Sequence, residues 1–188
     1  MGTKTAAGER TSDDGPLAGI YTDETSSGEV VMGNTIWDTN EGIFFHQSRD
    51  QIVVSNVLVN VGPRSAIFVG NAQGSVNGGP LWIESNVAAW TGAQTVRYSD
   101  GYLQGNPWFW MDRGIVSYGK AVEESPEIYG VAGLQAKGRE PHVVLTESPL
   151  FVDAEAKDYR IAGSAIPLVK KQGFAAGWLL EGAGAKAK

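Results

Sequence analysis

Short apolar runs separated by polar turn residues make up the segment from Leu17 to Ala89. The runs are rich in Val, Ile and aromatic side chains, and Gly, Ser, Asn and Asp cluster between them. Runs of this composition with this punctuation are typical of β-strands and turns. No stretch of the segment shows the 3.6-residue period of an amphipathic helix. The pattern therefore predicts a β-rich domain with short strands.

Two phrases recur along this segment. "GIYTDE" starts at residue 19, "GIFFHQ" 23 residues later and "AIFVGN" a further 24 residues on. A second phrase ("VMGNTIWD", "VVSNVLVN", "WIESNVAA") places Asn34, Asn56 and Asn86 at equivalent points. A period of this length without helices predicts a parallel β-helix, in which each repeat is one coil. We expect the three asparagines to stack and bond to one another, since buried amides need partners.

The repeat fades after Trp90. We predict one domain over 17–188, with a loose arm at 1–16, an irregular insertion at about 90–140 and a closing segment at about 147–180 that caps the stack. A short helix is expected near 121–131. A leucine-rich repeat has the same period, but its L-x-x-L-x-L framework is absent. A β-sandwich is the remaining alternative.

The composition and net charge of the chain exclude some classes of function. The 188 residues carry a net charge of −6, and the Lys and Arg residues are scattered, which argues against nucleic acid as a partner. Gly occurs 25 times, against about 13 expected from average usage, which favours many tight turns. There is no cysteine, no apolar run long enough to span a membrane and no apolar signal core near Met1.

Two blocks of sequence resemble a known family. "GIYTDETSSGEVVMGNTIWDTNEGIFFHQSRDQIVVSNVLVNVGPRSAIFV" and "SPLFVDAEAKDYRIAGSAIPLVKKQGF" are similar to the pectin-lyase-like right-handed β-helix proteins among bacterial glycoside hydrolases and polysaccharide lyases. The likeness covers about half of the chain, over 17–75 and 148–174. Glu24 and Gln51 stand where the family pattern has Asp and Asn, and the chain looks like the C-terminal part of such a fold. The resemblance implies an extracellular or periplasmic protein that acts on a polysaccharide.

The polar residues that differ from one repeat to the next are the candidates for catalysis. Asp23 and His46 lie at matching positions on neighbouring coils, and a carboxylate beside an imidazole can do general acid–base work. Asp50 is a further catalytic candidate. A glycoside hydrolase needs a second carboxylate, and Asp50 or Glu41 could pair with Asp23. A distance of about 5–5.5 Å between the two carboxyl groups would predict retention of the anomeric configuration, and about 6.5–9.5 Å would predict inversion. In the alternative, His46 is a surface residue with satisfied hydrogen bonds.

Aromatic side chains are the candidates for holding sugar rings. Strand alternation puts the isoleucines Ile20, Ile43 and Ile67 inside and the rings of Tyr21, Phe44 and Phe68 outside. In the alternative, the rings belong to the core. The residues predicted to contact substrate are Tyr21, Glu24, Phe44, Arg49, Trp108 and Trp110. In a lyase, Arg49 would act at the uronate carboxylate. In the alternative, Arg49 and Asp50 form a turn salt bridge.

We predict no cofactor, with Ca²⁺ as the one candidate ion because β-helix lyases commonly bind it. Its oxygen ligands would come from Glu24, Asp38, Glu41 and Asp50, although no compact D-x-D-x-D spacing is present. The favoured function is polysaccharide cleavage, with hydrolysis ahead of β-elimination because carboxylates outnumber well-placed basic residues. The rival is a non-catalytic carbohydrate-binding or structural module. An exposed coil end or the Trp-rich insertion is a candidate homodimer surface.

Overall fold

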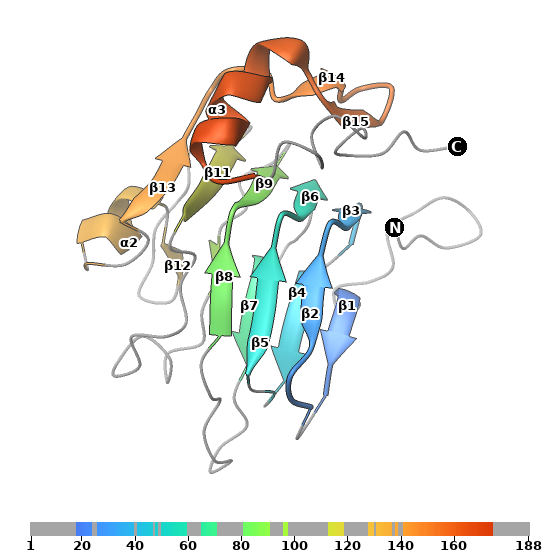
Figure 1. Ribbon diagram of the computed structural model, residues 1–188, viewed down its shortest axis with the longest axis vertical. Helices are drawn as coiled ribbons and strands as arrows, with labels where there is room; N and C mark the ends of the chain where they lie inside the picture. The colour runs from blue at the N-terminus through green and yellow to red at the C-terminus, as the bar shows by residue number, and fades with distance from the viewer. Residues whose placement is uncertain are drawn as a thin grey trace.

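The structure is a computed structural model that describes 18–23, 26–39, 41–46, 48, 50–59, 65–70, 81–90, 96–97, 113–118, 128–129, 131–136, 138 and 141–174. Strands dominate these residues, and the helical segments are few and short (Figure 1). The elements are β1 (Ala18–Thr22), β2 (Val30–Met32), β3 (Thr35–Trp37), β4 (Glu41–His46), β5 (Gln51–Val54), β6 (Val57–Val59), β7 (Ser65–Gly70), β8 (Leu81–Glu84), β9 (Asn86–Trp90), β10 (Val96–Arg97), β11 (Arg113–Tyr118), β12 (Ile128–Tyr129), α2 (Val131–Ala136), β13 (His142–Leu145), β14 (Phe151–Asp153), β15 (Asp158–Ile161), η1 (Gly163–Ala165) and α3 (Ile166–Lys171).

Three parallel sheets form the body of the protein. Their strand orders are β1-β4-β7, β2-β5-β8 and β3-β6-β9-β11-β13, so the chain visits the sheets in turn and then returns to the first. Ala18 pairs with Glu41, and Glu41 pairs with Ser65, which reproduces the 23- and 24-residue spacings of the sequence repeat. The fold is therefore all-β and mainly parallel, as predicted. The parallel pairing argues against the β-sandwich alternative, whose sheets are antiparallel.

Alternating burial separates the two faces of these sheets. Across β2, β5 and β8 the middle residues Val31, Val53 and Ile83 are buried, while their neighbours Val30, Ile52 and Trp82 are exposed. On β4, Ile43 and Phe45 are fully buried. The apolar interior thus lies between the sheets, and Ile43 and Ile67 belong to it as predicted.

The predicted asparagine stack is present. Oδ1 of Asn56 accepts hydrogen bonds from the backbone N–H and the side-chain amide of Asn34, both at 3.0 Å. Oδ1 of Asn86 accepts the same pair of bonds from Asn56, also at 3.0 Å. The residues just before Asn56 and Asn86 are Ser55 and Ser85, each with a φ of 55°. This left-handed turn aims each amide along the stack.

The stack ends on a side chain from the closing segment. Gly114 pairs with Asn86 in register, so it occupies the next rung, but it has no side chain to continue the pattern. The backbone N–H of Gly114 instead donates to Oε1 of Gln172, at 3.2 Å, in a buried position. The residue on the next rung is Val143, which has no amide, so Gln172 supplies the carbonyl that an asparagine at that rung would have offered to Gly114.

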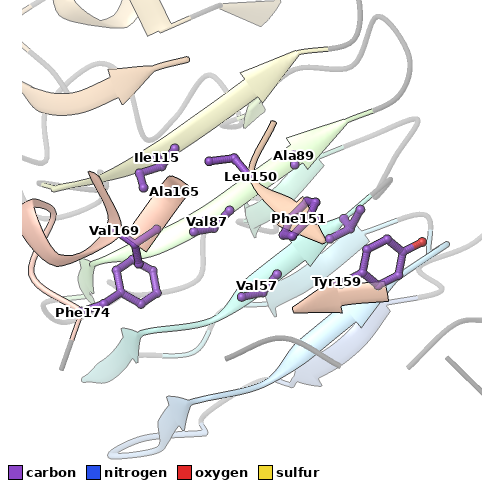
Figure 2. Packing of buried hydrophobic residues seen from close by; sticks show 11 residues of the cluster. Val57, Val87, Ala89, Ile115, Leu150, Phe151, Tyr159, Ala165, Val169 and Phe174 are labelled. Carbon is purple, nitrogen blue, oxygen red and sulfur yellow. The ribbon is translucent and has the colours of Figure 1, made fainter. Parts of the chain in front are cut away.

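The closing segment packs on the outer face of the third sheet. Side chains from β14, β15, η1 and α3 meet side chains of β6, β9 and β11 there (Figure 2). The buried cluster comprises Val57, Val59, Val87, Ala89, Ile115, Leu150, Phe151, Tyr159, Ala165, Val169 and Phe174. The segment was predicted to cap an open end of the stack. Its apolar residues instead cover a sheet face, which explains why β6 is buried on both sides.

The stretch predicted as an insertion is not wholly irregular. Within 90–140, β11 joins the third sheet and pairs in parallel with β9 and β13. Most of the helix expected near 121–131 falls on 121–127, outside the described residues. Residues 128–129 form β12, and α2 begins at Val131. The arm at 1–16 and the Trp108–Met111 cluster lie outside the described residues.

Candidate functional site

The candidate site lies where β1 and β4 end. Tyr21 is on β1, Asp23 follows that strand and His46 is the last residue of β4. The register pairs Tyr21 with Phe44 and Thr22 with Phe45, which brings Asp23 beside His46, at the matching position of the next repeat. The parallel register, set by the 23-residue spacing, therefore joins two residues that the sequence analysis had selected.

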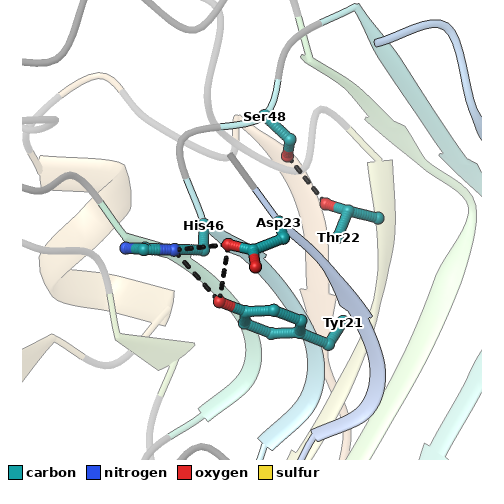
Figure 3. Close-up of polar contacts among 5 residues, drawn as sticks. All are labelled: Tyr21, Thr22, Asp23, His46 and Ser48. Atoms are coloured by element: carbon teal, nitrogen blue, oxygen red, sulfur yellow. Dashed lines mark hydrogen bonds and ion pairs between the residues drawn. The ribbon is translucent and has the colours of Figure 1, made fainter. Parts of the chain in front are cut away.

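Three polar side chains form a closed triangle (Figure 3). The Tyr21 hydroxyl donates to Asp23 Oδ1 at 3.0 Å, and His46 Nδ1 lies 3.0 Å from both that oxygen and the hydroxyl. If His46 Nδ1 lacked a proton, it would be an acceptor facing another acceptor, the Asp23 carboxylate oxygen. The consistent assignment puts a proton on Nδ1, so that imidazole and phenol both donate to the carboxylate. His46 Nε2 lies on the side of the ring away from both partners (Figure 3), and it is the nitrogen that general acid–base chemistry would use.

The triangle lies at the surface, with a partly sheltered imidazole. The Asp23 side chain is 66% exposed and the His46 side chain 27% exposed. Tyr21 stacks with the His46 ring at 6.1 Å between centroids and meets Phe44 edge-on at 5.1 Å. An ordered phenol and imidazole at an open surface can reach a large substrate without a deep cleft.

Phe44 does not belong to an exposed aromatic platform. Tyr21, Phe44 and Phe68 are in register across the first sheet, as expected. Phe44 is only 7% exposed, so the prediction that it holds a sugar ring at the surface is wrong. Tyr21 and His46 both pack on its ring, which leaves Phe44 as the support beneath the triangle. Tyr21, in contrast, is 42% exposed.

A buried hydrogen bond that the sequence analysis missed holds the site in place. Thr22, between Tyr21 and Asp23, donates from Oγ1 to the hydroxyl of Ser48 at 2.7 Å. Ser48 lies two residues beyond His46, so this bond ties together the two strand ends that carry the triangle. The only sequence signal was that Thr22 and Ser48 lie 26 residues apart, close to one repeat.

The other carboxylates have separate roles. Asp50 adopts a φ of 54°, accepts a hydrogen bond from the Ser27 hydroxyl at 2.9 Å and receives the Gly28 N–H on its carbonyl. Glu41 is fully buried, which argues against it as a partner of Asp23 at a surface site. No described contact joins Asp50 or Glu41 to the triangle. The remaining candidates Glu24, Arg49, Trp108 and Trp110 lie outside the described residues.

Asp38, a proposed calcium ligand, forms an ion pair with the closing segment. Its Oδ2 lies 2.5 Å from Lys157 Nζ, and the Asp38 side chain is only 7% exposed. Burial and then the Asp38 charge raise the pKa of Tyr159, while Lys157 lowers it. Among the described residues, no three His, Cys, Asp or Glu side chains gather closely enough to hold a metal ion. Calcium binding stays a prediction.

Comparisons with known proteins bring no family assignment. No protein-family model, no curated protein and no solved structure matches the chain. Within the part of the chain that the structure describes, no helix is long and apolar enough to cross a membrane.

Proposed function

We propose that the protein is a right-handed parallel β-helix of the pectin-lyase-like kind that binds and cleaves a polysaccharide. The repeated course through three parallel sheets supports this architecture, because right-handed crossovers are the rule between parallel strands. The stacked asparagines add support, since each repeat then behaves as one coil resting on the next.

The observation that carries the proposed activity is the Tyr21–Asp23–His46 triangle. Asp23 holds the imidazole in one tautomer and stabilises its cationic form once it has taken a proton. For hydrolysis, His46 Nε2 takes a proton from a water molecule, whose oxygen forms the new bond at the anomeric carbon. The glycosidic C–O bond breaks, and its oxygen receives a proton from the Tyr21 hydroxyl.

Cleavage by β-elimination is the second candidate, and the 3.0 Å contact between Tyr21 and His46 favours it. In this reaction His46 removes the proton next to a uronate carboxylate, and a carbon–carbon double bond forms. The bond to the leaving oxygen breaks, and Tyr21 gives that oxygen its proton. One base and one acid suffice here, whereas hydrolysis by the usual route needs two carboxylates. Arg49, if it reaches the uronate carboxylate, would stabilise the intermediate charge.

The test is a polysaccharide panel assayed for new reducing ends and for the ultraviolet absorbance of unsaturated uronates. His46→Ala should lower the rate about 10²–10⁴-fold, because it removes the proton acceptor. His142→Ala is the matched control. His142 is the one other histidine of the chain and is exposed on β13, so its loss should leave the rate unchanged. Reducing ends without absorbance indicate hydrolysis, and absorbance indicates elimination. A folded protein without activity on any substrate would support the non-catalytic alternative.

A further inference from the structure

A second group of exposed side chains lies on the sheet formed by β2, β5 and β8. Val30, Ile52 and Trp82 pair in register across the three strands and are 59%, 42% and 63% exposed. They form an apolar row about 10 Å long, because neighbouring strands lie about 4.8 Å apart. This sheet faces the viewer in Figure 1 and carries none of the triangle residues.

Trp82 ends the row beside a fixed polar pair. Its Nε1 donates to Glu84 Oε2 at 2.8 Å, and the other carboxylate oxygen of Glu84 lies 3.7 Å from Nε of Arg113. The Glu84 side chain is 23% exposed and that of Arg113 42% exposed. The hydrogen bond fixes the orientation of the indole, so its exposed face is pre-organised. Since Nε1 already has a partner, the ring can be covered without stranding a buried donor.

The charges of this group select the ligand class. A cationic or an anionic partner would be attracted by one member of the pair and repelled by the other, so the pair favours neither sign of charge. The pair is neutral overall yet offers both donors and acceptors at the edge of a flat apolar ring. A neutral sugar ring matches it, because C–H groups can lie on the indole while hydroxyl groups reach the carboxylate and guanidinium.

The size of the patch argues against a protein partner. A stable protein interface buries about 800 Å² on each side, and a row about 10 Å long across three strands, with the exposed Met32 beside it, falls well short of that area. We propose that Trp82, Glu84 and Arg113 form a binding site for one or two neutral sugar rings, on a sheet separate from the acid–base triangle. The proposal rests on the proposed carbohydrate function and adds a second point of attachment for the chain.

Isothermal titration of the full chain with neutral xylo-, cello- and manno-oligosaccharides tests the proposal, with oligogalacturonate as the acidic comparison. Trp82→Ala should weaken binding of the best neutral ligand about tenfold, because the ligand loses the apolar face it covers. Glu84→Gln should weaken it several-fold, since one charge-assisted acceptor is lost. Val30→Ala is the control: it trims an exposed residue of the same row two strands away and should leave binding unchanged. The melting temperatures of all variants show that each is folded.

The outcomes separate this inference from the proposed activity. If the wild-type protein binds and Trp82→Ala binds equally well, the inference is wrong, whatever the result for His46. If no neutral oligosaccharide binds at millimolar concentration, or if Val30→Ala loses as much affinity as Trp82→Ala, it is wrong as well. If oligogalacturonate bound more tightly than the neutral oligosaccharides, and its binding depended on Trp82, the prediction that the ligand is neutral would be wrong. Binding that depends on Trp82 but without cleavage would support the inference and refute the proposed activity.

Discussion

Asn56 is the central residue of the asparagine stack, between Asn34 and Asn86. Its side-chain amide donates to Val31 O at 2.9 Å, Val54 O at 3.1 Å and Asn86 Oδ1 at 3.0 Å. Its Oδ1 accepts the two bonds from Asn34. The side chain is fully buried, so no water can replace these bonds. Asn56→Ala would therefore strand several buried polar groups at once.

The magnitude follows from the partners that Asn56→Ala leaves behind. A buried group without its partner costs about 1–3 kcal/mol, but Val54 O keeps a bond from Gly33 and Asn86 Oδ1 keeps the backbone N–H of residue 56. We expect a loss of about 3–5 kcal/mol in the free energy of unfolding, a large share of the roughly 5–15 kcal/mol typical of a domain. Asn34→Ala is the matched control. Asn34 is part-exposed at the end of the stack, and its loss should cost only about 1 kcal/mol.

Urea unfolding followed by far-ultraviolet circular dichroism measures both values, provided that the slope of the transition is unchanged. Asn56→Asp is a near-isosteric second variant. Its carboxylate would face three acceptors, so this variant should be less stable at pH 8 than at pH 4, where protonation restores one donor. If Asn56→Ala cost no more than Asn34→Ala, the asparagine stack would be a consequence of the packing of the parallel strands and not a cause of it.

Two further predictions concern the closing segment. Gly173→Ala should destabilise the protein by about 2 kcal/mol, because φ is +89° and the new Cβ would lie 2.6 Å from Ser85 Oγ. Gly28→Ala is the control, because φ is +82° and nothing lies within 4 Å of the new Cβ, so only backbone strain destabilises this variant. If both variants lowered the melting temperature equally, the contact with Ser85 would not contribute to the loss at Gly173. Stability should fall as pH rises above about 10, because the raised pKa of Tyr159 means that the native state holds its proton longer than the unfolded chain. Tyr159→Phe should flatten that decline in urea titrations between pH 8 and 11, and an unchanged decline would assign it to other groups.

The repeat made the sheets, the asparagine stack and the Asp23–His46 contact predictable. All three follow from register, and register follows from spacing when identical short strands pair in parallel. The burial of Phe44 could not be predicted from the repeat. Strand alternation places Phe44 opposite Ile43, but both are buried because Tyr21 and His46 cover the outer ring. Alternation tells which side of a strand a residue is on and not whether that side is covered.

Contacts made by the closing segment were beyond sequence reasoning for a different reason. Lys157 reaches Asp38 across 119 residues, and Gln172 meets Gly114 across 58, with no repeat to set the distance. Yet Gln172 obeys the same chemical demand as the asparagines, since a backbone N–H at a buried rung needs a side-chain carbonyl. Because Val143 stands at the rung after Gly114 and has no amide, the acceptor for the Gly114 N–H has to come from elsewhere in the chain. A missing asparagine at a rung is thus itself a signal that another segment reaches that point.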